Sequence, residues 1–276
     1  MRAATPAVSV CVPAYQAERF LGATMRSVLA QNLGDFELLV LDNASTDRTE
    51  VVAHSFDDYR IRVIRNPRVL PLAENWNLAV HYSRAPLVKL LCADDLLRPD
   101  CLRLQHQALI GRTDLSLTAC RRDFVDDAGR RLVAGRGLRG LIGRHDRTAV
   151  ARRIVRDGGN PVGEPGSVLF RREHFEAVGG FDGRLSFPMD LDLWLRMLDH
   201  GDFHGMADSL AAFRVRPGSL SGKAGRAEYA EQRSYTRHIG GVRPVDRALS
   251  SVNAPAARLR RQGLFLLAGH YARQSG

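Results

Sequence analysis

Two adjacent carboxylates, Asp94 and Asp95, end an apolar run in the segment LLCADDLL, residues 90–97. Like charges side by side repel, so the pair requires a cation, a proton or good solvation. Asp42 ends another apolar run, and the whole chain carries a net charge of +10. One or two Asp carboxylates, completed by phosphate oxygens and water, are the ligands that Mg²⁺ or Mn²⁺ prefers. Together these features predict a site for a nucleoside diphosphate bridged by a divalent cation.

The elements that must position these acids alternate between strands and helices. The strands are expected at 8–12, 36–41, 61–64 and 87–91, and the helices at 18–31, 45–54, 72–82 and 99–110. Continuous apolar strands that alternate with helices are typical of an α/β fold with a mainly parallel sheet covered on both faces. Ligands of such sheets bind beyond the carboxyl ends of the strands. Pro13-Ala14-Tyr15, Asp42-Asn43 and Asp94-Asp95 stand at these ends.

Beyond residue 115 the pattern loosens. Strands are expected at 115–119, 168–170 and 203–215, a hairpin at 124–133 with its turn at 127–129, a Gly- and Arg-rich loop at 135–143, and helices at 173–178 and 190–200. From about Arg226 the composition shifts to Arg-rich helical segments, 226–239 and 255–272. A basic amphipathic helix can lie on anionic lipid. The alternative is a tail that packs on the sheet domain or on a second subunit.

The bulk composition favours a folded chain with anionic partners. The 276 residues are 45% hydrophobic and 25% charged, and the pI is near 10.2. No window approaches the roughly 20 uninterrupted apolar residues of a membrane-spanning helix, and the N-terminus lacks the apolar core of a signal peptide. We therefore expect a cytoplasmic protein. The four cysteines are widely spaced without a CxxC pair, a pattern that favours neither a zinc site nor a disulfide framework.

Three ordered segments resemble one known family, the inverting family 2 glycosyltransferases of the GT-A fold. They are VSVCVPAYQAERFLGATMRSVLAQNLGDFELLVLDNASTDRT at 8–49, LLCADDLL at 90–97 and GSVLFRREHFEAVGGFDGRLSFPMDLDLWLRML at 166–198. The resemblance implies a Rossmann-like GT-A domain over 1–222, with a nucleotide-binding half at about 1–120 and an acceptor-binding half at about 121–222. Residues 223–276 then form a C-terminal helical extension. The implied activity is transfer of a sugar from a nucleoside-diphosphate-sugar to an acceptor hydroxyl with inversion, in the biosynthesis of cell-surface polysaccharide or another glycoconjugate.

The resemblance also implies roles for the polar residues on the donor side. The Pro13-Ala14-Tyr15 loop and Asp42 would hold the base and ribose, with Asp42 accepting from the base. Asn75 or Asn77 would approach the donor, and Arg216 would reach the diphosphate. The alternatives are Asp42 as a helix cap, Asn77 as a helix-surface amide and Arg216 as a solvated loop residue.

The same resemblance assigns the metal, Mg²⁺ or Mn²⁺, to the acidic pair. Asp95 would ligate it, and Asp94 would contact the ribose or the water shell of the metal. Relatives often carry Asp at the position of Cys92, which is expected to point back toward the apolar environment of its strand. Metal binding should therefore depend heavily on the phosphates of the donor itself.

Asp190 is the expected catalytic base. In inverting transfer a carboxylate removes the proton of the acceptor hydroxyl while that oxygen attacks the sugar. Asp190 occupies the second position of an acidic pair in the family, and Met189 replaces the first. Asp192 competes for the role, but it lies about 200° around the helix, so only one of the two can face the cleft. The alternative for Asp190 is a charge that favours the helix dipole.

The expected partners are a UDP-, dTDP- or GDP-sugar donor and a glycan, lipid-linked or small-molecule acceptor. A homodimer and contact of the C-terminal helices with the inner face of the plasma membrane are further expectations, and nucleic acid is not an expected partner. A metal-dependent nucleotidyltransferase, a nucleic-acid-binding protein and a non-catalytic sugar-nucleotide binder are the alternatives. A nucleotidyltransferase usually brings a Gly-rich phosphate loop, which the N-terminus lacks.

Overall fold

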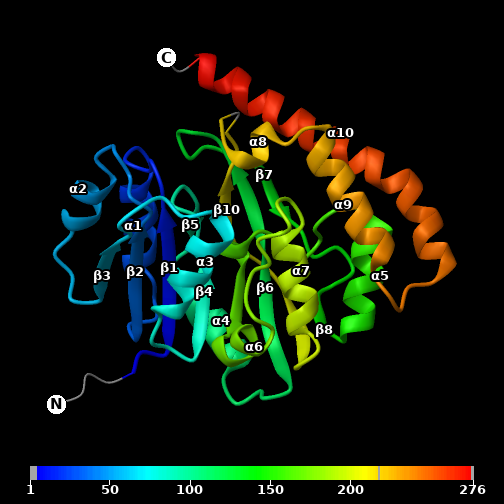
Figure 1. Cartoon of the computed structure of the whole chain (residues 1–276), viewed down its shortest axis with the longest axis horizontal. Coiled ribbons are helices and arrows are strands. Elements are labelled where there is room, and N and C mark those ends of the chain that lie inside the picture. The colour runs from blue at the N-terminus through cyan, green and yellow to red at the C-terminus, as the bar shows by residue number, and fades with distance from the viewer. Residues whose placement is uncertain (1–4, 217, 275–276) are drawn as a thin grey trace.

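The computed structural model describes residues 5–216 and 218–274, the side chains of 220, 221 and 269–274 excepted. Its centre is a ten-stranded sheet in the order β3-β2-β1-β4-β9-β6-β10-β5, with β7 beside β6 and β8 beside β10. Helices cover both faces of the sheet (Figure 1). The strands are β1 Val8–Ala14, β2 Phe36–Asp42, β3 Ile61–Arg65, β4 Leu87–Leu90, β5 Leu96–Leu97, β6 Leu115–Val125, β7 Arg131–Arg136, β8 Gly143–His145, β9 Val168–Arg171 and β10 Asp202–Arg214. The helices are α1 Leu21–Leu29, α2 Thr49–His54, α3 Leu72–His81, α4 Cys101–Leu109, α5 Arg147–Asp157, the 3₁₀ turn η1 Pro165–Ser167, α6 Arg172–Ala177, α7 Met189–Met197, α8 Leu220–Lys223, α9 Arg226–His238 and α10 Pro244–Gln274.

The first half of the chain forms the parallel part of the sheet. β1 lies between β2 and β4, β3 lies on the outer side of β2, and all these pairs are parallel. Every residue of β1, β2 and β4 is buried, which explains why these strands appear as continuous apolar runs. Two hydrophobic cores result, one with α1 and α4 and the other with α3, α6 and α7. The predicted α/β class with helices on both faces is confirmed.

The second half continues the same sheet with mixed strand directions. β9 runs antiparallel to both β4 and β6, whereas the long strands β6 and β10 are parallel. The predicted hairpin is present as β6 and β7, closed by a hydrogen bond of 3.0 Å from Gly129 N–H to the Asp126 carbonyl. Because one sheet runs through both halves, the division near residue 120 stays a prediction.

Two predicted helix starts are wrong. The helix after β2 begins at Thr49 with Arg48 as its N-cap, whereas the sequence placed its start at residue 45. α10 begins at Pro244 and contains Pro255 in its interior, whereas the sequence placed its start at Pro255. Pro255 lies on the exposed side of α10, where the helix carbonyl that it leaves unpaired can be hydrated.

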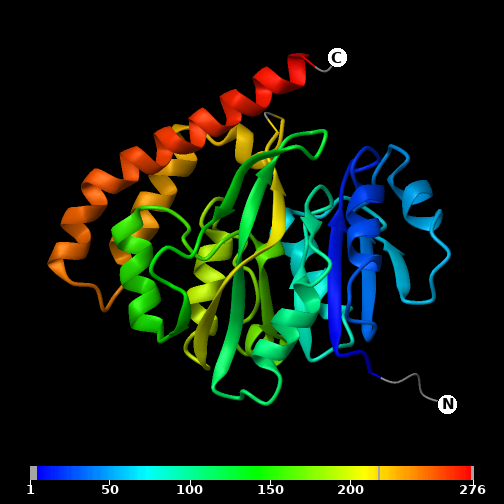
Figure 2. The same cartoon turned by 180° about the vertical axis from the view of Figure 1, so that it is seen from behind.

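The C-terminal extension packs on the sheet domain through α5. Asp246 is fully buried and accepts hydrogen bonds from Arg152 Nε at 2.8 Å and Arg156 Nη2 at 2.5 Å. These bonds, with that from Arg152 the larger, lower the pKa of Asp246 to about 2. Further along, Ala254 lies so close to Gly158 that a Cβ there would come within 2.4 Å of the Ala254 methyl. α10 therefore runs beside α5 and α9 along the edge of the molecule (Figures 1 and 2).

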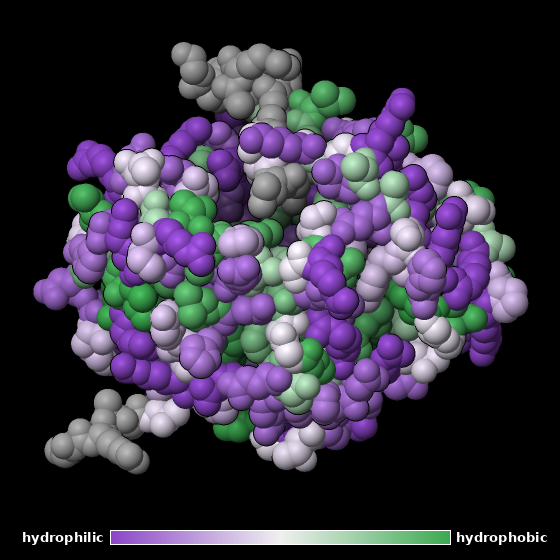
Figure 3. All heavy atoms as spheres, in the orientation of Figure 1, coloured by the Kyte–Doolittle hydropathy of each residue, from purple (hydrophilic) through white to green (hydrophobic). Residues whose placement is uncertain are grey.

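The face of the molecule drawn in Figure 3 is mainly hydrophilic. On the face of Figure 3, apolar side chains are scattered among hydrophilic ones. Within the described part of the chain, no helix combines the length and apolar character needed to cross a membrane.

Candidate active site

A cleft of about 2500 Å³ opens beyond the carboxyl ends of β1, β4 and β10. Both halves of the chain and the C-terminal extension contribute to its walls. Of the predicted site residues, Pro13, Ala14, Tyr15, Asn75, Asn77, Asp94, Asp190 and Arg216 line this cleft, whereas Asp42 and Asp95 do not.

The end of β1 forms one wall of the cleft. Pro13 and Ala14 are the last residues of the strand and are buried, and Tyr15 is exposed. The chain then turns through Gln16, whose φ is 50°, and whose N–H donates to Ser45 Oγ at 3.0 Å. This bond ties the loop after β1 to the loop after β2, so the expected base-binding loop has a fixed shape.

Asp42 lies behind this wall. Its side chain is fully buried; Oδ1 accepts from the Ser45 N–H at 3.1 Å, and Oδ2 forms an ion pair with Arg65. The neighbouring Asn43 lines the cleft instead. The contact of Asp42 with the base stays a prediction.

Three buried amides connect the loops under the same wall. Asn66 Nδ2 donates to Asn43 Oδ1 at 2.9 Å and to Asn75 Oδ1 at 2.8 Å. Asn77 has another use, because its Oδ1 accepts from the Phe181 N–H at 2.8 Å and its Nδ2 donates to the Phe181 carbonyl at 3.0 Å. Asn77 thus joins the backbone at Phe181 to α3, and Asn75 is the amide linked to the loops after β2 and β3.

The two adjacent acids point in different directions. Asp94 lines the cleft, and its Oδ2 accepts from Arg216 Nε at 2.9 Å and Nη2 at 2.6 Å. Asp95 is buried, and its Oδ1 accepts from the Arg214 N–H at 2.9 Å. Burial, and then the charge of Asp94, raise the pKa of Asp95 well above its ordinary value. Metal ligation by Asp95 stays a prediction, and it requires this side chain to turn away from Arg214.

Cys92 corrects one expectation. Its side chain lines the cleft instead of pointing back toward the strand. Burial raises the pKa of the thiol, and the charges of Asp95 and Asp94 raise it further. The thiol is therefore neutral, and a neutral thiol is a poor ligand for a hard cation.

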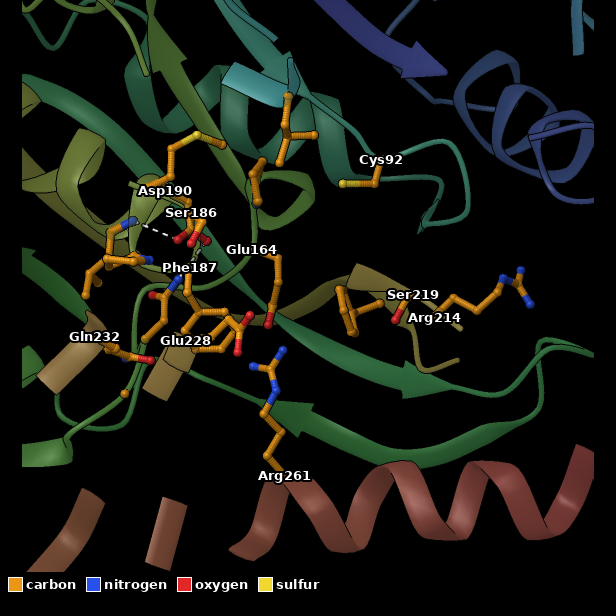
Figure 4. A pocket seen from close by; sticks show the side chains of 18 of the residues that line it. Cys92, Glu164, Ser186, Phe187, Asp190, Arg214, Ser219, Glu228, Gln232 and Arg261 are labelled. Carbon is orange, nitrogen blue, oxygen red and sulfur yellow. Dashed lines mark hydrogen bonds between the residues drawn. The ribbon is translucent and has the colours of Figure 1, made fainter. Parts of the chain in front are cut away.

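Asp190 reaches the cleft from the start of α7 (Figure 4). Its Oδ1 accepts from the Leu191 N–H at 2.8 Å, and its Oδ2 accepts from Asn160 Nδ2 at 3.0 Å. Burial, and then the nearby charge of Glu164, raise the pKa of Asp190 to about 7. A carboxylate with that pKa can take up a proton near neutral pH.

The side chain of Asp192 points away from the cleft. Its Oδ2 accepts from Arg196 Nε at 2.7 Å, and its Oδ1 accepts from the Tyr235 hydroxyl at 3.2 Å. Asp192 does not line the cleft. Of the two acids in the first turn of α7, Asp190 is thus the one in position to meet a substrate.

Comparison with known proteins identifies the family. The sequence profile of Glycosyl transferase family 2 matches residues 9–179. The chain belongs to glycosyl transferase family 2. Asp190 lies just beyond the matched residues, so its role depends on the geometry described above.

Two curated relatives and one solved structure resemble this family 2 chain. An uncharacterized protein of Mycobacterium tuberculosis, MT1568, is 30% identical over 71% of the chain, which spans 63% of that relative's length. The putative glycosyltransferase EpsE of Bacillus subtilis is 26% identical over 91% of the chain and 84% of its own. The mannosyltransferase PcManGT of Pyrobaculum calidifontis, solved in complex with GDP-Man and Mn²⁺, covers 99% of this chain and 76% of its own, with a TM-score of 0.64 and 17% identity. This likeness shows a shared fold, the GT-A type expected from the sequence.

Two residues that the sequence reasoning missed complete the site of this family 2 protein. Asn160 holds the carboxylate of Asp190, and Glu164 pairs with Arg122 while its charge acts on Asp190. Both lie in the loop between α5 and η1, residues 158–164, whose sequence GGNPVGE is dominated by turn-forming residues. No periodic signal marks them, because their roles come from contacts with distant residues.

The cleft offers few protein side chains that could ligate a metal ion. Among the residues whose placement the structure describes, no group of three or more His, Cys, Asp and Glu is arranged to hold a metal ion. Asp94 is the carboxylate of the predicted pair that lines the cleft. This set fits an ion that takes most of its ligands from phosphate and water, as Mg²⁺ does.

The raised pKa of Asp190 predicts a pH-dependent effect on stability. The folded protein keeps this proton up to a pKa of about 7, whereas the unfolded chain loses it near 3.8. The contribution of Asp190 to stability therefore falls as the pH rises through this window. Relative to wild type, Asp190→Asn should gain on the order of 2 kcal/mol, or about 5 °C in Tm, between pH 5 and pH 8. Thermal melts at several pH values measure this, and a constant Tm difference would contradict the shift.

Proposed function

We propose that this family 2 protein transfers a sugar from a nucleoside-diphosphate-sugar to an acceptor hydroxyl with inversion, in the biosynthesis of cell-surface polysaccharide or another glycoconjugate. The observation that carries the proposal is the pair of acids in one cleft, Asp94 beside Arg216 and Asp190 with a pKa of about 7. EpsE, a relative over most of the chain, is named a putative glycosyltransferase. PcManGT, which shares the fold, was solved with GDP-Man and Mn²⁺.

The donor occupies the side formed by β1 and α3. Pro13, Ala14 and Tyr15 provide a surface for the base and ribose, and Asn75 offers its amide there. Asp42, held by Arg65, lies behind this surface and is the proposed acceptor of a hydrogen bond from the base. The three-amide connection from Asn43 to Asn75 keeps these loops in register, so the donor meets a surface that is already ordered.

The diphosphate lies against Asp94 and Arg216. Because Asp94 lines the cleft and Asp95 does not, we assign a bound Mg²⁺ or Mn²⁺ to Asp94, in place of the ligation by Asp95 expected from the sequence. The metal would offset negative charge on the leaving diphosphate. Arg216 carries a guanidinium whose planar fork suits phosphate oxygens. Its present bonds to Asp94 keep it at this end of the cleft.

Asp190 removes the proton from the acceptor hydroxyl. Its hydrogen bonds from Leu191 and Asn160 fix the carboxylate plane. Burial, and then the charge of Glu164, raise the pKa of Asp190 to about 7, which strengthens it as a base near neutral pH. The attacking oxygen then approaches the sugar from the side opposite the diphosphate, which gives inversion.

The C-terminal helices support the expected contact with an anionic membrane surface at the inner face of the plasma membrane. Val245, Val252, Leu259 and Leu266 recur every seven residues on α10, and each is more than half exposed. Arg260, next to Leu259, is exposed as well. Apolar residues flanked by arginine suit the interface of an anionic bilayer. A cytoplasmic location and a homodimer are further parts of this proposal.

A thermal-shift panel tests the proposed donor. UDP-, dTDP- and GDP-sugars are added with and without Mn²⁺, with the free sugars as controls. A ligand that binds the folded protein at 100 times its Kd stabilises it by about 2.7 kcal/mol, which is about 5 to 10 °C in Tm for a chain of this size. We expect nucleotides of one base to raise Tm, and to do so more with Mn²⁺. If none of the nucleotide-sugars raised the Tm, the proposal would be contradicted. In a separate assay of the reaction products, release of pyrophosphate instead of nucleoside diphosphate would indicate a nucleotidyltransferase.

A further inference from the structure

The segment that leads into α7 and Asp190 is held by a carboxylate of the C-terminal extension. The Ser186 N–H donates to Glu231 Oε1 at 2.9 Å, and the Ser186 hydroxyl and the Phe187 N–H donate to Glu231 Oε2 at 2.7 and 2.9 Å. Glu231 belongs to α9 and lies 45 residues beyond Ser186 in the chain. Partial burial raises the pKa of Glu231, but the hydrogen bonds from Ser186 and Phe187 outweigh it and lower the pKa. Glu231 is therefore ionised at neutral pH.

The side chain of Phe187 is held by the same extension. Its ring packs edge to face on Tyr229 of α9, with the ring centroids 5.5 Å apart, and the Arg261 guanidinium of α10 lies 5.1 Å from the centroid of Phe187. Both kinds of contact are favourable beyond the burial that they provide. In Figure 4, Ser186 and Phe187 lie on the side of the cleft that carries Asp190. The extension thus fixes the backbone and the ring of a residue three positions before the proposed base.

The start of α7 needs this outside support because it has no side-chain cap of its own. Pro188 is the N-cap residue and makes no capping hydrogen bond through its side chain. The first N–H groups of a helix have no partner inside the helix, so an uncapped first turn is weakly held. Asp190 is the second residue of α7 and moves with this turn. Leu193 and Trp194, further along, are fully buried in the core and fix the rest of the helix.

Glu231 can influence the substrates only through other residues. It does not line the cleft, whereas Ser186, Phe187 and Asp190 do. We propose that Glu231 is a positioning residue for sugar transfer, which fixes the first turn of α7, and with it the Asp190 carboxylate, by holding Ser186 and Phe187. This proposal rests on the proposed function, because that function makes Asp190 the base. The C-terminal extension is then part of the catalytic unit.

The kinetics of Glu231→Ala test the proposal. A displacement of about 1 Å can reduce turnover about 100-fold, so kcat should fall about 10- to 100-fold. Turnover is measured as release of nucleoside diphosphate from the nucleotide-sugar that raises the wild-type Tm most. The loops after β1 and β2 are unchanged, so the KM of the donor and the Tm shift that it causes should stay as in wild type. Glu231→Gln, which keeps one accepting oxygen, should lose less activity.

Tyr235→Phe is the matched control. Tyr235 lies one turn beyond Glu231 on α9 and outside the cleft, and its hydroxyl donates to Asp192 Oδ1 at 3.2 Å. The variant therefore loses a hydrogen bond between α9 and α7 without releasing Ser186 or Phe187. It should keep the kcat of the wild type.

A second readout uses the protein without substrate. Burial, more than any charge, raises the pKa of Asp190 to about 7, and Glu164 and Arg261, whose charges also act on it, stay in place in Glu231→Ala. A loosened first turn exposes Asp190 and lowers this pKa toward its ordinary value. The gain in Tm that Asp190→Asn brings between pH 5 and pH 8 should therefore be smaller in the Glu231→Ala background. In the Tyr235→Phe background it should stay as in wild type.

The outcomes separate this proposal from the proposed function. Wild-type kcat in Glu231→Ala, or an equal loss in Tyr235→Phe, would overturn the positioning role and leave the proposed function intact. Loss of the donor-induced Tm shift in Glu231→Ala would also overturn it, because general unfolding would then explain the lost activity. If Glu231→Ala does not fold, Glu231→Gln carries the same tests with a smaller expected loss. If the wild type neither binds nor turns over any nucleotide-sugar, the proposed function fails instead, and the Tm comparison still tests the hold of Glu231 on Asp190.

Discussion

Replacing Asp190 with Asn should reduce sugar transfer by about 10² to 10⁴ at saturating donor and acceptor, because Asn cannot take up the hydroxyl proton. The substitution keeps the shape of the side chain and can still accept from the Leu191 N–H, which lies 2.8 Å from Asp190 Oδ1. The loss should therefore appear in kcat, with little change in the KM of the donor. Steady-state kinetics of donor consumption and product formation measure both parameters.

Asp192→Asn is the control for the first turn of α7. Asp192 binds Arg196 and Tyr235 away from the cleft, so this variant should lose stability and keep its turnover.

In the wild type, log kcat should rise with pH and level off near the Asp190 pKa of about 7, since the base acts in its ionised form. Normal turnover in Asp190→Asn, or a larger loss in Asp192→Asn, would exclude Asp190 as the base.

The second large effect is expected at Asp94. Asp94→Asn removes the carboxylate that lines the cleft and holds Arg216. Charge stabilisation by a bound metal amounts to several kcal/mol, so kcat/KM should fall roughly 100-fold or more. The response of the remaining activity to added Mn²⁺ should also be weak. Measuring kcat/KM, and then titrating the activity with MnCl₂ at a fixed donor concentration, tests both expectations.

Asp95→Asn is the matched comparison, one residue away. The raised pKa of Asp95 favours its protonated form, and Asn can accept from the Arg214 N–H in its place. Activity and its dependence on Mn²⁺ should therefore change only a few-fold. If Asp95→Asn abolishes the Mn²⁺ response and Asp94→Asn retains it, then Asp95 is the metal ligand and must turn toward the cleft when the donor binds.

Much of the first half of this fold could be predicted from the sequence, because its central strands are buried on both faces. Such strands appear as apolar runs, and their carboxyl ends mark the position of the cleft. The family resemblance added Asp190, whose side-chain partner Asn160 lies 30 positions away in the chain. The start of α10 could not be found in this way, because tertiary contacts of Asp246 with α5 stabilise the turns before Pro255.

The directions of individual side chains were the second feature that could not be predicted from the sequence. Asp94 and Asp95 have the same chemistry and adjacent positions, and their different partners distinguish them: Arg216 donates to Asp94, and the Arg214 N–H donates to Asp95. Asn66 and Asn160 act through residues 9 and 30 positions away in the chain, and no local pattern reports such contacts. The sequence therefore located the cleft, but it could not assign each neighbouring acid to the surface or the interior.

The way α10 is attached has an evolutionary consequence. Its first turns hold it to α5 through Asp246 and Ala254, and residues between 257 and 267 of its second half line the cleft. A related chain can therefore exchange the residues of this second half while it retains the anchor, the sheet and the donor loops. Under the proposed function, such exchange would alter the part of the cleft wall that α10 provides while leaving the donor loops unchanged.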